Sequence, residues 1–76
     1  MAYELQRLAP GSYDVLRHGT VIASLVNNGG HSATTTWTVE LLEEMLTVEL
    51  PTPFTEPEHT FDSLGAAKNW LGIAVR

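Results

Sequence analysis

The sequence predicts an α+β domain, in which an antiparallel sheet of three to five strands carries a single C-terminal helix on one face. Residues 3–42 alternate repeatedly between apolar and polar side chains and are divided by turn-forming residues, as antiparallel strands are. Residues 62–71 instead repeat their apolar side chains at the spacing of a helix. A length of 76 residues suits one domain and not two, so we take residues 1–76 as a single domain.

Three strands are predicted in the first third of the chain. Tyr3–Leu8 and Tyr13–His18 are joined by Ala9–Ser12, where Pro fixes φ and Gly accepts positive φ, so this pair is predicted to form a hairpin. A second tight hairpin at Arg17–Thr20 leads into Thr20–Val26. This third strand is rich in β-branched residues and is predicted to be well buried.

The clearest strand is Thr34–Leu42, which follows a loop at Asn27–His31. Its odd-numbered positions are mostly apolar and its even-numbered positions mostly polar, which indicates one buried face and one wet face. Residues 43–50 fit either a helix or a strand. We predict a turn at Glu43-Glu44 followed by a short strand, because Thr47 and Val48 are poor helix formers.

The last third is predicted to be a connection followed by the helix. Three prolines make residues 51–60 an extended connection on the surface. Asp62 or Ser63 can cap the helix over residues 62–71, Phe61 can staple its first turn, and Gly72 stands where a C-terminal cap belongs. The apolar stripe consists of Leu64, Ala67, Trp70 and Leu71.

The chain contains no cysteine, which excludes a disulfide framework, a thiolate zinc site and a cysteine nucleophile. Small secreted domains usually need disulfides, so their absence favours the reducing cytoplasm. No basic and apolar leader opens the sequence, and no apolar run approaches 18 residues. We therefore expect a cytoplasmic protein with no membrane partner.

No motif for catalysis, metal binding or a cofactor is found. The histidines, His18, His31 and His59, lack the close spacing of a ligand pair, and Glu56 and Glu58 would meet a metal with His59 only by chance. The acidic pairs Glu43-Glu44 and Glu56-x-Glu58 fall in turns and loops, without the apolar cleft that acid–base catalysis requires. We predict a protein that is not an enzyme.

The two tryptophans have two interpretations. Trp37 and Trp70 are residues of the type that anchors binding interfaces. Trp37 lies on the apolar face of its predicted strand and Trp70 on the apolar stripe of the helix, so we expect both to pack in the core, Trp70 more firmly than Trp37.

The net charge of −5 is concentrated in one segment. Residues 1–39 carry as many basic as acidic side chains, whereas residues 40–62 carry seven carboxylates and no Lys or Arg. Such a segment either keeps a small protein soluble or attracts a basic partner. The candidate partner-binding residues are Glu40, Glu43, Glu44, Glu49, Glu56, Glu58 and Asp62.

The segment Phe61-Asp62-Ser63-Leu64-Gly65-Ala66-Ala67-Lys68-Asn69-Trp70-Leu71 resembles the Phe-x-Ser/Thr-x-x-Glu-Ala-x-x-Trp-Leu ending of small β-β-β-α modules. These modules include the arm-type DNA-binding domains of phage tyrosine integrases and the plant AP2 domain. The resemblance implies a helix docked on a sheet, with Ala66 in place of the usual Glu. It also implies DNA binding by basic residues on the sheet, but here the strands carry little beyond Arg7 and Arg17, and phosphates would repel a chain of charge −5.

The size, acidity and architecture are also similar to those of small phage-encoded inhibitors, among them anti-CRISPR proteins. That similarity implies action inside a bacterial host cell, against the positively charged nucleic-acid site of a host complex. The sequence thus favours a protein-binding module with a basic protein partner. Two rivals stay open: a nucleic-acid-binding module using Arg7, Arg17 and Lys68, and an assembly protein that forms a homodimer through a sheet edge.

Overall fold

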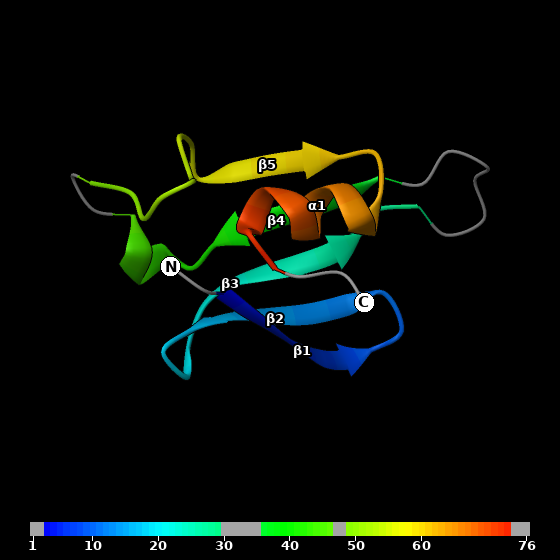
Figure 1. The fold of residues 1–76 in the computed structure, drawn as a ribbon, viewed down its shortest axis with the longest axis horizontal. Coiled ribbons are helices and arrows are strands. Elements are labelled where there is room, and N and C mark those ends of the chain that lie inside the picture. Colours follow the sequence, from blue (N-terminus) through cyan, green and yellow to red (C-terminus); the bar gives the residue numbers. More distant parts are fainter. Residues whose placement is uncertain (1–2, 30–35, 47–48, 74–76) are drawn as a thin grey trace.

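The computed structural model describes residues 3–29, 36–46 and 49–73, and within these ranges it contains one antiparallel sheet and one α-helix. The sheet order is β1-β2-β3-β4-β5, so each strand lies beside its neighbours in sequence (Figure 1). The α+β class, with an antiparallel sheet and a C-terminal helix, is confirmed. The strands are β1 (Tyr3–Ala9), β2 (Ser12–Arg17), β3 (Thr20–Asn27), β4 (Trp37–Leu41) and β5 (Glu58–Phe61).

Both predicted hairpins are present, and both turns use positive φ. Gly11 has φ of 80° in the turn between β1 and β2. In the turn between β2 and β3, His18 has φ of 54° and Gly19 has φ of 79°. Two consecutive residues with positive φ are the mark of a type I′ turn, whose twist matches that of the strands it joins.

A β-bulge in β3 explains an interruption of the alternating pattern. Val15 pairs with Ala23 and Leu16 pairs with Val21, so Ile22 is an extra residue in the ladder. Ile22 is 2% exposed and Ala23 is 0% exposed, so both are buried although they are consecutive. The bulge therefore adds one large side chain to the core that a regular strand would have turned to the other face.

The helix α1 (Leu64–Leu71) packs on the face of the sheet toward β4 and β5 (Figure 1). Ser63 is its N-cap, with Oγ accepting from the Ala66 N–H at 3.0 Å, and Gly72 is its C-cap at φ of 77°. The predicted caps are thereby confirmed. The core between the helix and the sheet comprises Tyr3, Val15, Ile22, Ala23, Leu25, Val39, Leu41, Phe54, Ala67 and Leu71.

The segment between β4 and α1 differs from expectation in two respects. The predicted turn is a 3-10 turn, η1 (Glu43–Met45), but Leu46, Glu49 and Leu50 are not in a strand, and residues 47–48 lie outside the described part. The expected surface connection over residues 51–60 instead contains the buried Phe54, which is 5% exposed, and most of β5.

Pro57 explains why this strand is possible despite the nearby prolines. A proline cannot donate to a sheet ladder, but β5 is an edge strand and begins immediately after it. The carbonyl of Pro57 accepts a hydrogen bond from the Leu41 N–H at 2.9 Å. At the opposite edge of the sheet, the Tyr3 hydroxyl donates to the carbonyl of Thr52 at 2.6 Å, which ties the connection to β1.

Candidate functional site

The face of the sheet that α1 does not cover presents a row of polar side chains across all five strands. The strand register places these residues directly opposite one another: Gln6, Asp14, Ser24, Glu40 and Glu58. Their neighbours in sequence, among them Val15, Leu25 and Val39, are buried on the helix side. Since side chains alternate along a strand, this row points away from the core.

A second row, of hydroxyl groups, lies beside the first and is held by hydrogen bonds. Thr38 on β4 and Thr60 on β5 are opposite each other, and their Oγ1 atoms are 3.1 Å apart. The Asn28 side chain donates to Oγ1 of Thr36 at 3.1 Å and to Oγ1 of Thr38 at 2.6 Å. This network connects the start of the β3–β4 loop with the edge strand.

Glu40 and Glu58 form the closest acidic pair of the face. The Leu41 N–H bonds to Pro57 on the β5 side, and the Leu42 N–H bonds to Ile22 on the β3 side. The N–H of Glu40 therefore points toward β3, and Glu40 and Glu58 form a non-hydrogen-bonded pair. Such pairs bring side chains closer together than hydrogen-bonded ones. Two like charges in this position oppose the stability of the sheet.

A shallow hollow of about 280 Å³ opens beside this acidic pair. Its walls are the carboxylates of Glu40 and Glu58, the hydroxyl and amide groups of neighbouring side chains, and one apolar side chain. That apolar side chain is Val26, which is 42% exposed. The hollow is lined by Ser24, Val26, Asn28, Thr38, Glu40 and Glu58.

Charge is segregated between the two sides of the described sheet. Glu4 on β1 alternates with the buried Tyr3 and the half-buried Leu5, so it joins Asp14, Glu40 and Glu58 on the uncovered face. Arg7 and Arg17 pair with Tyr13 and Tyr3 at helix-side register positions, and Lys68 lies on α1. The uncovered face thus carries four carboxylates and, within residues 3–29, 36–46 and 49–73, no Lys or Arg.

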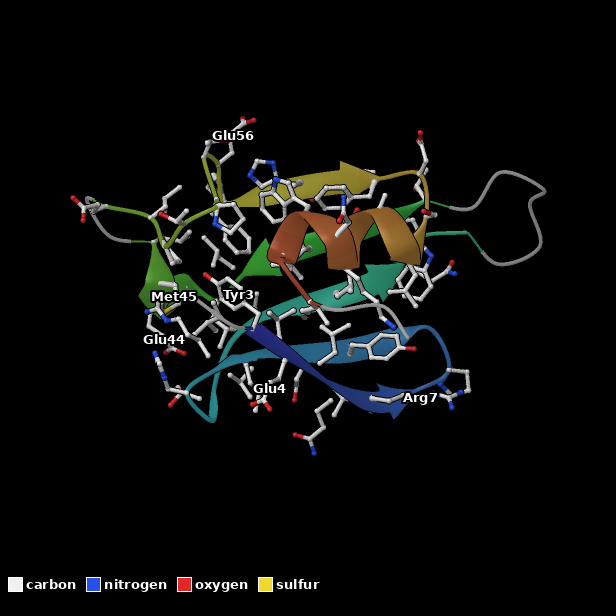
Figure 2. The ribbon with its side chains drawn as sticks, in the orientation of Figure 1. Tyr3, Glu4, Arg7, Glu44, Met45 and Glu56 are labelled. Atoms are coloured by element: carbon white, nitrogen blue, oxygen red, sulfur yellow. The ribbon has the colours of Figure 1, made fainter. Side chains whose placement is uncertain are left out.

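The structure divides the seven carboxylates that the sequence singled out. Two of them, Glu40 and Glu58, lie on the uncovered face, while the others are exposed around one end and one edge of the sheet. Figure 2 shows Glu44 in η1 and Glu56 in the turn before β5. We call the remaining carboxylates the rim: Glu43, Glu44, Glu49, Glu56 and Asp62.

Sequence reasoning missed Glu4 and Asp14, because they belong to a segment whose net charge is zero. Strand pairing places them on the same face as acidic residues that are distant in sequence, with Ser24 between Asp14 and Glu40. The signal that was available is the alternation itself, which places Asp14 and Glu40 on the polar side of their strands.

The aromatic rings of both tryptophans contact the core, as expected. Trp37 and Trp70 are half-buried and pack against the core. The ring of Trp70 contacts Phe54 at 4.9 Å and Phe61 at 5.1 Å between centroids. Phe61 therefore contacts the last turn of the helix, where Trp70 lies.

No group of three or more His, Asp or Glu side chains is placed to hold a metal ion in the described ranges, and His31 lies outside them. The described helix is too short to cross a membrane. Comparison of the chain with family models, with curated proteins and with solved structures finds no match. The site must therefore be interpreted from its own geometry.

Proposed function

We propose that this chain is a non-enzymatic protein-binding module whose uncovered sheet face binds a basic surface of another protein. The observation that carries the proposal is the segregation of charge. One face of the sheet carries four carboxylates from four different strands and, in the described part of the chain, no Lys or Arg. These carboxylates are Glu4, Asp14, Glu40 and Glu58. Complementary charge of this kind steers association and fixes the orientation of a complex.

The spacing of the row suits a set of guanidinium or ammonium groups. Adjacent strands lie about 4.8 Å apart, so the carboxylates from Asp14 to Glu58 extend over about 14 Å. Glu40 and Glu58 are adjacent and can share one cation, which would enter the hollow beside them. The exposed Val26 offers an apolar contact beside that cation.

The acidic pair also supports a binding role through its effect on stability. Like charges directly opposite each other in a sheet are destabilising. A partner cation bound between Glu40 and Glu58 would remove this repulsion in the complex. Residues that lower stability in the free protein and gain favourable contacts on binding are characteristic of functional surfaces.

We further propose that the partner surface is a nucleic-acid-binding site of a host complex, which would make the module an inhibitor of the kind that phages encode. A surface that matches a row of carboxylates is also one that binds phosphates. The rim carboxylates would add long-range steering. The partner should then bind either nucleic acid or this module, and the two should compete.

The test compares two variants of equal charge. Asp14→Asn/Glu40→Gln/Glu58→Gln removes three charges from the face, and Glu43→Gln/Glu44→Gln/Glu56→Gln removes three from the rim. A host protein is first captured with the wild-type chain, and its affinity for each variant is then measured at several salt concentrations. If each contact contributes about 0.5 kcal/mol, the face variant should bind roughly tenfold more weakly.

The rim variant should retain its affinity within about threefold and associate more slowly, because distant charges act mainly on the on-rate. Wild-type binding should weaken as salt rises and should be displaced by DNA or RNA. Equal binding of the two variants, or binding that is insensitive to salt, would contradict the proposal. In a gel-shift at low salt the chain itself should retain no nucleic acid.

A further inference from the structure

His59 on β5 connects the aromatic residues of the core region to the turn that precedes β5. Its side chain is half-buried on the helix side, opposite Val39 of β4. The imidazole centroid lies 4.6 Å from the ring of Trp70 and 5.9 Å from the ring of Phe54. These contacts fix the position of the ring from two sides.

The imidazole is also a hydrogen-bond acceptor for the turn. Nε2 of His59 accepts from the backbone N–H of Thr55 and from the backbone N–H of Glu56, both at 3.3 Å. A histidine nitrogen can accept only when it carries no proton. Both bonds therefore require the neutral ring with its proton on Nδ1, and the charged ring would direct an N–H at two other N–H groups.

We propose that His59 is a pH-sensitive clamp that holds the turn over residues 55–57 when neutral and releases it when protonated. Histidine is the residue type that changes charge between about pH 5 and 8. Release of the turn would free Glu56 and loosen the start of β5, where Glu58 contributes to the acidic face. In this role the clamp regulates the proposed partner-binding face and rests on that proposed function.

The surroundings of His59 allow the protonated imidazole to keep its position when its hydrogen bonds to the turn are lost. The charged side chains on the elements around His59 are Glu56 in the turn, Glu58 on β5, Glu40 on β4, Asp62 after β5 and Lys68 on α1. Glu40 and Glu58 point to the uncovered face, away from the imidazole, whereas the adjacent Trp70 ring attracts a cation. Protonation thus exchanges two accepted hydrogen bonds for a contact between the charged imidazole and the Trp70 ring.

Two substitutions fix the clamp in its two states. His59→Gln places a carbonyl oxygen, which accepts hydrogen bonds at every pH, near the position of Nε2. His59→Phe keeps an aromatic ring between Phe54 and Trp70 but has no acceptor. Agreement of both variants with the wild type in core amide exchange, measured at Leu25 and Val39, shows that each one folds.

The experiment is an NMR titration of the backbone amides from pH 8 to pH 5. In the wild type, the amides of Thr55 and Glu56 should shift together with the His59 ring signals and lose roughly tenfold in exchange protection, the factor for one ordinary hydrogen bond. His59→Gln should keep its protection across the range, and His59→Phe should lack it throughout. His18→Asn, which removes the other described histidine, should leave the titration unchanged.

The proposal would be overturned if the amide shifts and exchange protection of Thr55 and Glu56 did not change with pH in the wild type. It would also be overturned if the midpoint of their change matched that of His18 and not that of His59. This readout needs no partner, so it decides on the clamp even if the proposed function fails. With a partner in hand, affinity should fall between pH 7.5 and pH 5.5 for the wild type and change less for His59→Gln. A clamp that titrates while the affinity of both proteins falls equally would show that the turn does not control the acidic face.

Discussion

Glu58→Lys should stabilise the protein, because it replaces the repulsion between Glu40 and Glu58 with an attraction. Side chains directly opposite each other in a sheet have Cβ atoms about 5 Å apart. Two unit charges at about 5 Å in water interact by about 0.8 kcal/mol, and salt at about 0.15 M roughly halves this. Removing the repulsion and adding the attraction should therefore raise the free energy of unfolding by about 0.8 kcal/mol at physiological salt, and by up to about 1.6 kcal/mol at low salt.

The assay is urea unfolding, followed by the fluorescence of the half-buried Trp37 and Trp70 at two salt concentrations. Glu58→Gln should give about half the gain, and the control Glu56→Gln, in a turn outside the strand ladder, should give little. The double variant Glu40→Lys/Glu58→Lys restores a like-charge pair and should return close to wild-type stability. A Glu58→Lys protein no more stable than wild type at low salt, or a gain independent of salt, would refute the assignment of a close acidic pair.

Three further predictions concern the framework that supports the face. His18→Asn should stabilise the protein by about 0.5 kcal/mol in thermal unfolding, because asparagine accepts the φ of 54° in the type I′ turn more readily; a loss of stability would contradict that turn. Ser63→Ala should cost about 1 kcal/mol, since it removes the cap that accepts from Ala66, whereas Ser63→Asp should retain most of the stability. Leu71→Ala should lower the free energy of unfolding by about 2–5 kcal/mol, because the Leu71 side chain is only 2% exposed. Leu8→Ala, at a side chain 58% exposed, should change it by less than about 0.5 kcal/mol. Similar losses in the two variants would place Leu71 outside the core.

The elements with strong local signals were predictable from the sequence. Pro10-Gly11 and His18-Gly19 marked the hairpins, because positive φ is a local demand on the chain. Ser63 and Gly72 marked the ends of the helix for the same reason. The buried and polar faces of β2 and β4 followed from alternation, since each strand has one dry side.

Features that depend on contacts distant in sequence were not predictable. Strand β5 has little apolar alternation of its own and exists because β4 provides an edge for it. Phe54 packs against Trp70 and His59, and the sequence around Phe54 contains no pattern that indicates its burial. Three strand pairings place Asp14 and Glu58 in the same row of the acidic face. The distribution of charge along the sequence therefore indicates only Glu40 and Glu58 of this face.

The order of the strands has a consequence for how the protein folds. The pairings β1–β2 and β2–β3 close loops of only two residues, whereas β4–β5 must close the connection over residues 42–57. Longer loops cost more entropy to close, so we expect the β4–β5 pairing to form last and to open first. Glu40 and Glu58 lie on the two sides of that final pairing. The acidic face is therefore complete only in the fully folded chain, and a partner that bridges these two residues would hold the edge strand in place.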